Sequence, residues 1–214
     1  MTPTDTASTP GAVPARPRHT AAGRRTRERI VQTAAELMYR KGVAGTSIPD
    51  VQQAARVSAS QIYHYFSDKT ELVRAVIAHQ VERTIEGQQP LLDQLDSLQA
   101  LRAWRDAVIS AQERQNCAGG CAIGSLASEL VETYEPLRGD LAEAFDRWES
   151  PIRSGLRRMR QDGVLVATAD VDQLASALLA AVQGGLLLSQ VRRSSQPLRA
   201  ATEAAIGYVE SFAA

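Results

Sequence analysis

The chain is poor in several features, and each shortage excludes a class of protein. Of its 214 residues only two are cysteine, so disulfides cannot hold the fold together and we expect packing in a reducing compartment. The N-terminus lacks the apolar core of a signal peptide, and the most apolar stretch, 174–191, is interrupted by polar residues. We therefore expect a cytoplasmic protein rather than a secreted or membrane-spanning one.

Strand patterns and catalytic constellations are also missing. No run of alternating apolar and polar residues is long enough to indicate a β-strand. The sequence shows no nucleophile–base pair, paired-carboxylate signature, glycine-rich phosphate loop or cluster of metal ligands. These absences favour an all-α protein that is not an enzyme and holds no metal or cofactor.

Neither sign of charge is in excess overall, because 24 basic residues balance 24 acidic ones. The balance hides an asymmetry: residues 24–75 carry nine basic and five acidic residues, whereas 76–214 carry thirteen and eighteen. Residues 1–23, rich in Thr, Pro, Ala and Gly, are predicted to form a disordered tail. A small basic module joined to a larger acidic one predicts an N-terminal unit that faces a polyanion.

Helical periodicity runs through the rest of the chain from residue 26. Three capping signatures within 25 residues mark closely spaced helix starts: Ser47 with Asp50, Ser58 with Gln61, and Asp68 with Glu71. The predicted helices span about 26–41, 48–54, 59–66, 68–87, 98–116, 122–131, 136–161, 170–193 and 197–212. We expect about nine helices, in a compact domain over 24–75 and a larger one over 76–214.

Two of the short predicted helices, 48–54 and 59–66, are joined by a tight turn, which is the spacing of a helix-turn-helix. In that motif, here about 47–66, the second helix enters the DNA major groove by its N-terminal end. Its outward positions hold small or polar residues that suit close approach and base contacts: Ala59, Ser60, Gln61 and His64. Lys69 and the amides near Thr46 and Ser47 are suited to phosphates.

These residues resemble the N-terminal domain of the TetR family of transcriptional regulators. The resemblance covers about 24–75 and rests on Arg27-Glu28-Arg29-Ile30, Gly42, Thr46-Ser47-Ile48, Val57-Ser58, Ile62-Tyr63-His64-Tyr65-Phe66, Lys69 and Leu72. It implies an all-α homodimer that binds double-stranded operator DNA, with a ligand-binding and dimerisation domain over 76–214. In that arrangement helices 170–193 and 197–212 pair with those of a second copy.

The resemblance also assigns roles to single residues. Base or near-base contacts fall on Ser60, Gln61, Tyr63 and His64, and phosphate contacts fall on Thr46, Ser58, Tyr65 and Lys69. Two positions depart from the family pattern: Gln52 stands where a small residue is usual, and Arg56 where glycine is usual. Arg56 is either an additional phosphate contact or a strained turn residue.

A second segment, Gly-Gly-Cys-Ala-Ile-Gly-Ser-Leu-Ala-Ser-Glu-Leu over 119–130, is similar to one in a TetR subgroup linked to multidrug efflux control. That similarity implies a repressor released by a hydrophobic small molecule, neutral or cationic. The large side chains of the C-terminal domain are first of all core residues, but a ligand pocket would draw on some of them. The candidates are Trp104, Cys121, Leu126, Tyr134, Phe145, Trp148 and Gln183.

Several alternatives stay open from the sequence. Cys117 and Cys121 are either ordinary buried thiols or a redox switch, because Cys121 precedes a helix whose N-terminus would lower its pKa. Glu129 is either a solvated residue or a counter-charge for a cationic ligand. An architectural DNA-binding protein without a ligand is a further alternative. Glycines 184 and 185, inside an apolar helix, indicate the close approach of another helix or of a ligand.

Overall fold

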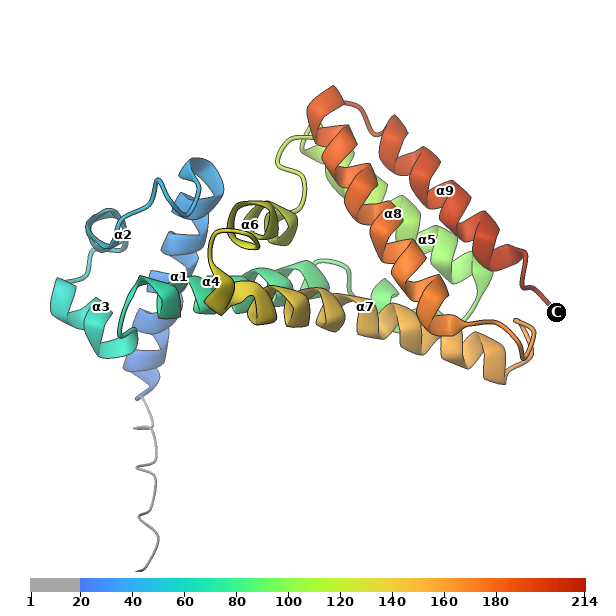
Figure 1. The fold of residues 1–214 in the computed structure, drawn as a ribbon, viewed down its shortest axis with the longest axis horizontal. Coiled ribbons are helices and arrows are strands. Elements are labelled where there is room, and N and C mark those ends of the chain that lie inside the picture. Colours follow the sequence, from blue (N-terminus) through green and yellow to red (C-terminus); the bar gives the residue numbers. More distant parts are fainter. Residues whose placement is uncertain (1–19) are drawn as a thin grey trace, which may run out of the picture.

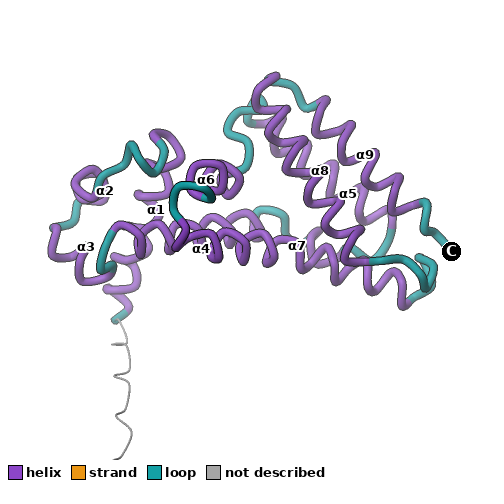
Figure 2. Tube along the Cα trace, in the orientation of Figure 1, coloured by secondary structure: helices purple, strands orange, loops and turns teal. Residues whose placement is uncertain are grey.

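The computed structural model describes residues 20–214, and they form an all-α structure. Figure 2 shows helices joined by connecting loops; within 20–214 the only β-type pairing is an isolated bridge between Leu165 and Ala213. Of the predicted tail, 1–23, residues 1–19 lie outside the described part of the chain. Nine α-helices are described: α1 (Ala21–Lys41), α2 (Ile48–Ala55), α3 (Ala59–Tyr65), α4 (Lys69–Glu86), α5 (Leu98–Arg114), α6 (Ala122–Leu130), α7 (Arg138–Gln161), α8 (Val171–Arg192) and α9 (Gln196–Glu210).

Helix α1 begins five residues before its predicted start at residue 26. The reason is a cap at Thr20, whose hydroxyl oxygen accepts a hydrogen bond from the Gly23 amide at 3.2 Å. Thr26, the predicted cap, lies inside the helix, and its hydroxyl donates to the Ala22 carbonyl. Residues 21–23, which composition placed in the tail, are therefore helical.

The capping residues predicted from the sequence define the next three helices. Ser47 and Ser58 each form a complete capping box, with Asp50 and Gln61 respectively. Asp68 caps α4 by accepting from the Glu71 amide at 2.9 Å, but the box is incomplete because the Glu71 carboxylate accepts from Ser67. The helix starts are thus local features, each set by a side chain and an amide three residues on.

The helices divide into an N-terminal group and a C-terminal group (Figure 1). Helices α1, α2 and α3 lie at one end of the molecule, and α5, α8 and α9 lie at the other. Helices α4 and α7 run side by side between the two ends and pack against each other. Arg74 on α4 and Asp140 on α7 form an ion pair at 3.0 Å, and α6 lies above this pair of helices in the view of Figure 1.

Helix α8 packs along α9 at the C-terminal end and also contacts α7. It is the one helix of the described chain long and apolar enough to cross a membrane, but nine of its residues are buried inside the protein. At Gly185 the two helices come so close that an added Cβ would lie 2.7 Å from the Leu198 Cα. One of the two glycines singled out in the sequence therefore serves packing within a single chain, which agrees with a buried core helix.

We predict that Gly185→Ala destabilises the protein. The new methyl group would meet the backbone of α9, which cannot rotate away as a flexible side chain can, so the expected loss is about 1–3 kcal/mol of unfolding free energy. Gly139→Ala is the matched control, because a Cβ there meets nothing within 4 Å and alanine favours the helix by up to about 1 kcal/mol. Urea unfolding at one protein concentration compares them, and equal effects would contradict the close approach at Gly185.

Candidate nucleic-acid interface and ligand pocket

Helix α3 presents a polar face to solvent and an apolar face to the core. Ile62 is fully buried and Phe66 is 2% exposed, as the predicted spacing required. The opposite side leaves Ala59, Ser60 and Gln61 exposed, together with Tyr63 and His64. Tyr63 is 57% exposed, a large exposed fraction for an aromatic residue in a short helix. The five residues expected near bases are therefore all exposed to solvent.

The capping box at Ser58 limits what Gln61 can do. The Gln61 side-chain oxygen accepts from the Ser58 amide at 2.8 Å, and the Ser58 hydroxyl oxygen accepts from the Gln61 amide at 3.2 Å. The Ser58 and Ser60 hydroxyls lie 2.9 Å apart. A bidentate contact with adenine needs both the oxygen and the amino group of a glutamine. The cap occupies one of the two lone pairs of the Gln61 oxygen and fixes its direction, so the amino group is the part of Gln61 best placed to contact a base.

The loop between α1 and α2 holds Thr46 and Ser47 in different environments. Ser47 is exposed and caps α2. Its hydroxyl donates a hydrogen bond to the Asp50 carboxylate at 2.5 Å, and this bond is the main reason why the pKa of Asp50 lies below its usual value. Thr46 is fully buried, and its hydroxyl donates to the Gly42 carbonyl at 2.8 Å. This placement does not fit the expected phosphate contact, because the buried hydroxyl is hydrogen-bonded within the loop.

Tyr65 and Lys69 also have partners within the chain. Tyr65 is half-buried against the core, and its ring meets that of His64 edge to face at 4.8 Å. The Lys69 ammonium donates to the Val43 carbonyl at 2.6 Å. An ammonium has three donors, so this bond leaves room for a phosphate. Lys69 thus holds the α1–α2 loop in the DNA-free protein.

Further basic residues of α1 and α2 are exposed in the N-terminal group of helices. Arg25 and Arg29 are exposed on α1, and the Arg27 guanidinium lies over the Phe66 ring at 5.2 Å from its centre. Arg56 ends α2 with φ 53° and ψ 53°, the left-handed conformation for which glycine is favoured. Of the two interpretations of Arg56, the strained turn is what the backbone shows, while its exposed side chain can still reach a phosphate.

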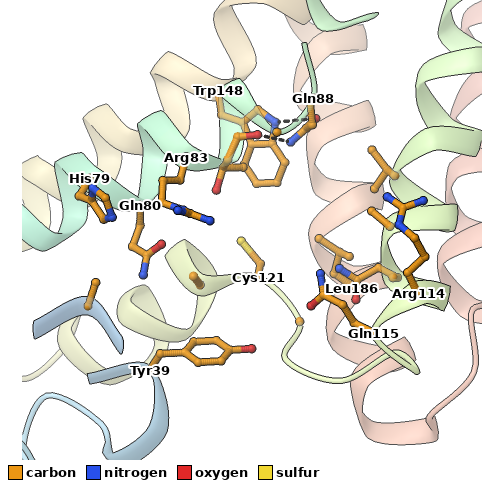
Figure 3. A pocket seen from close by; sticks show the side chains of 18 of the residues that line it. Tyr39, His79, Gln80, Arg83, Gln88, Arg114, Gln115, Cys121, Trp148 and Leu186 are labelled. Atoms are coloured by element: carbon orange, nitrogen blue, oxygen red, sulfur yellow. Dashed lines mark hydrogen bonds between the residues drawn. The ribbon is translucent and has the colours of Figure 1, made fainter. Parts of the chain in front are cut away.

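A cavity of about 700 Å³, the central pocket, lies between the two groups of helices (Figure 3). Figure 3 shows Tyr39 from α1 on one side, His79, Gln80 and Arg83 from α4 on another, and Cys121 at the start of α6. Other lining residues include Trp104, Val108 and Gln112 on α5, Trp148 on α7 and Leu186 on α8. An occupant would thus touch both the first helix of the N-terminal group and the core of the C-terminal group.

Gln88, just after α4, fixes both tryptophans of the pocket. Its side-chain oxygen accepts from the indole nitrogen of Trp104 at 2.8 Å and from that of Trp148 at 3.3 Å. The Gln88 amino group in turn donates to the Thr84 carbonyl at 3.0 Å. Both indoles are almost fully buried, so the end of the pocket that they form is built before any ligand arrives.

The seven residues predicted to line a ligand pocket separate into several places. Trp104, Cys121 and Trp148 line the central pocket, and the Gln183 amino group lies 3.5 Å from the Cys121 sulfur. Leu126 lines a smaller neighbouring cavity of about 100 Å³. Tyr134 lines a separate cavity of about 360 Å³ near Lys69, and Phe145 packs against the core. Helical periodicity predicts that Trp104, Phe145 and Trp148 face inward, but it does not separate one cavity from another.

Polar residues of α4 were missed by the sequence prediction. His79, Gln80 and Arg83 recur at helical spacing along the wall of the central pocket, and Gln88 follows just after the helix. This signal is visible only once one face of α4 is known to be covered. Burial is the main cause that lowers the pKa of His79, and the neighbouring Arg83 adds to it. This imidazole is therefore predominantly neutral at neutral pH.

The two cysteines have separate environments and both are free thiols. Cys117 is buried, whereas Cys121 caps α6, its sulfur accepting from the Gly124 amide at 3.3 Å. Among residues 20–214 no group of three or more His, Cys, Asp or Glu side chains could hold a metal ion. The cysteines thus contribute to the packing and capping around the pocket.

Comparison with known proteins identifies both halves of the chain. Residues 30–76 match the family of bacterial regulatory proteins of the tetR type, and 97–204 match the C-terminal domain of LmrA/YxaF-like transcriptional regulators. An uncharacterised helix-turn-helix regulator encoded in the lacX 3' region of Lactococcus lactis subsp. lactis is 32% identical over 78% of this chain and 85% of its own length. The transcriptional repressor DhaR of a Mycobacterium species, strain GP1, is 25% identical over 80% and 86%.

A solved structure extends the comparison to the fold. A TetR transcriptional regulator from Chloroflexus aurantiacus superposes with a TM-score of 0.73, at 27% identity over 91% of this chain and 98% of that one. The match includes the N-terminal helix-turn-helix and the helical C-terminal domain described above. The chain therefore belongs to the TetR family of helix-turn-helix transcriptional regulators.

Proposed function

We propose that this regulator is a repressor that binds an inverted-repeat operator as a homodimer and leaves it when a small apolar molecule fills the central pocket. The observation that carries the proposal is the position of that pocket, whose wall includes both α1 of the DNA-binding domain and α5, α7 and α8 of the C-terminal domain. We place this activity in the cytoplasm, where operator DNA is found.

Operator binding is supported by the charge and shape of the N-terminal domain. Residues 24–75 carry a net charge of +4, which attracts the phosphate backbone. Helix α3 exposes small and polar residues at its N-terminal end, the end that enters the major groove in this motif. Ser60, Tyr63 and the Gln61 amino group are our candidates for base contacts, with Ser47, Ser58 and Lys69 beside them for phosphates.

Dimerisation is supported by an apolar face that α8 and α9 leave uncovered. Leu187, Leu188 and Val191 on α8 are 60%, 46% and 73% exposed, and Tyr208 on α9 is 39% exposed. A Cβ added at Gly184, on the same side of α8, would meet nothing within 4 Å, so a second helix has room to approach there. We propose that this face pairs with its copy in a four-helix bundle, as in an isologous twofold dimer.

The effector class follows from the charges in the pocket wall. Two arginines, Arg83 and Arg114, and one glutamate, Glu36, are the charged residues that line it, and His79 is mainly neutral. The Gln112 side-chain oxygen is buried and has no hydrogen-bond partner among the described residues. We therefore propose an apolar effector that is uncharged or anionic, not cationic, and that carries a hydrogen-bond donor.

The first prediction concerns the dimer. Leu187→Glu places a carboxylate on the exposed apolar face, where a twofold partner would bury it unpaired, so we expect association at least a hundredfold weaker. Ala142→Glu is the control, since it adds the same side chain at an exposed position of α7. Sedimentation velocity measures both. A Leu187→Glu protein that remains as dimeric as the control would exclude this face as the interface.

The second prediction concerns base recognition. Gln61→Glu keeps the oxygen that caps α3 but removes the amino group, so the preferred base should change at one position of each half-site, with about a tenfold loss on the original operator. Gln53→Glu, an exposed change of equal charge on α2, should weaken binding to all sequences alike. Selection of bound sequences from random DNA shows both effects, and it also reveals whether the site is an inverted repeat. Unchanged preference in Gln61→Glu would exclude a base contact there.

The third prediction concerns the effector. Because both tryptophans of the chain line the pocket, a flat apolar ligand should quench the fluorescence of Trp104→Phe and of Trp148→Phe, each of which retains one indole. A hundredfold release of DNA requires about 2.7 kcal/mol of differential binding, and DNA must weaken ligand binding by the same factor. Titration of free and operator-bound protein measures that factor. A compound that releases DNA and quenches neither variant would bind outside this pocket.

A further inference from the structure

Glu129, near the C-terminal end of α6, reaches across to the DNA-binding domain. One carboxylate oxygen accepts a hydrogen bond from the Val43 amide at 2.8 Å, and the other accepts from the Ala44 amide at 2.7 Å. These partners lie 86 and 85 residues away in the sequence. Hydrogen bonds from backbone amides to a carboxylate are charge-assisted and roughly twice as strong as neutral ones. A single side chain thus holds two consecutive peptide groups of the α1–α2 loop.

The loop is shaped to receive this carboxylate. The Val43 peptide is held from its other side as well, because Lys69 donates to the Val43 carbonyl at 2.6 Å. Gly42 has φ +74°, and a Cβ there would lie 3.1 Å from one Glu129 oxygen and 3.2 Å from the other. The ψ of Gly42 is 166°, so its backbone lies outside the left-handed helical region although φ is positive. Gly42 is therefore needed both for its backbone conformation and for space.

The two ends of α6 contact different functional parts of the protein. Cys121, the N-cap of α6, and Ala122, its first residue, line the central pocket, whereas Glu129 near its other end binds the loop. The helix has nine residues and is therefore about 13 Å long. The loop leads directly to Ser47, the N-cap of α2. A displacement of α6 by an occupant of the pocket would reach the start of α2 through Glu129.

Electrostatics alone gives no reason for a carboxylate at this position. A negative charge beside a loop that faces DNA repels phosphates, so removing it should strengthen DNA binding. A positioning role predicts the opposite sign, because loss of the two hydrogen bonds frees the loop from α6. The sign of the effect therefore separates the two roles.

We propose that Glu129 is a positioning residue for operator recognition, which holds the α1–α2 loop, and through it α2 and α3, in the arrangement that fits the operator. The proposal rests on the proposed operator binding. Glu129 does not touch DNA in this role; it acts through the Val43 and Ala44 peptide groups. Glu129 does not line the central pocket, so it is not placed to serve as a counter-charge for a cationic ligand there.

The test compares three variants of the full chain with the wild type. Glu129→Gln keeps the shape but turns an amino group toward a backbone donor, and Glu129→Asp keeps the charge but is one methylene too short. Glu132→Gln is the matched control, because it removes the same charge from an exposed position three residues on. Fluorescence anisotropy at fixed salt measures binding to the selected operator and to a scrambled duplex.

We expect both Glu129 variants to lose about tenfold in operator affinity relative to the scrambled duplex, equivalent to about 1.4 kcal/mol. Glu132→Gln should leave that ratio unchanged. Wild-type ratios in both Glu129 variants would overturn the proposal. If the wild type itself prefers no sequence, the proposed operator binding fails instead, and the second measurement still tests the contact.

The second measurement is hydrogen exchange at single amides in the DNA-free protein. The Val43 and Ala44 amides should exchange at least tenfold faster in Glu129→Gln than in the wild type, while the melting temperature and the exchange of α3 amides stay close to those of Glu132→Gln. A uniform rise in exchange across the domain would indicate general destabilisation and would overturn a specific positioning role. Unchanged exchange at the two amides would exclude the contact itself.

Discussion

The continuity of α4 ties the two domains together, because its buried side chains pack on both sides of the boundary between them. Leu72, Val73 and Val76 lie in the half of the helix nearer its start, where it packs against α1, while Ile77 and Val81 continue the buried stripe toward α7. A helix transmits displacement along its axis because its backbone hydrogen bonds make it stiff. In the proposed mechanism, the orientation of the DNA-binding domain therefore depends on what α4 contacts at its far end.

Polar side chains at the far end of α4, and Gln88 just after it, line the central pocket between the packed helices. One oxygen of Gln88 accepts hydrogen bonds from two buried indole N–H groups. Leaving either N–H group without a partner would cost about 1–3 kcal/mol of stability. Because Gln88 directly follows α4, and Trp104 and Trp148 belong to α5 and α7, this one side chain fixes three elements relative to one another. A ligand that enters the pocket meets a preformed wall on the tryptophan side and the more exposed α1 and α4 residues on the other.

Two connections, helix α4 and the Glu129 contact, thus join the domains in parallel. The first is made of apolar packing, which is non-directional and tolerates sliding, and the second is made of directional hydrogen bonds at 2.7 and 2.8 Å. Arg74 and Asp140 add an ion pair between α4 and α7 that is partly exposed and hence contributes little to stability. In the proposed release of DNA, the packed surfaces would permit the domains to shift, and the hydrogen bonds would specify one end point of that shift.

The sequence by itself determined the helices, the caps at Ser47 and Ser58 and the outward face of α3. Each depends on residues three or four apart, and the family motif lies within one compact stretch of about fifty residues. Tertiary structure decided which inward-facing residues line the central pocket, why Thr46 is buried, and that Gly185 meets Leu198. It also brought Glu129 to Val43 across 86 residues, a contact that no local pattern specifies, because its existence depends on how whole helices pack rather than on the period of any one of them.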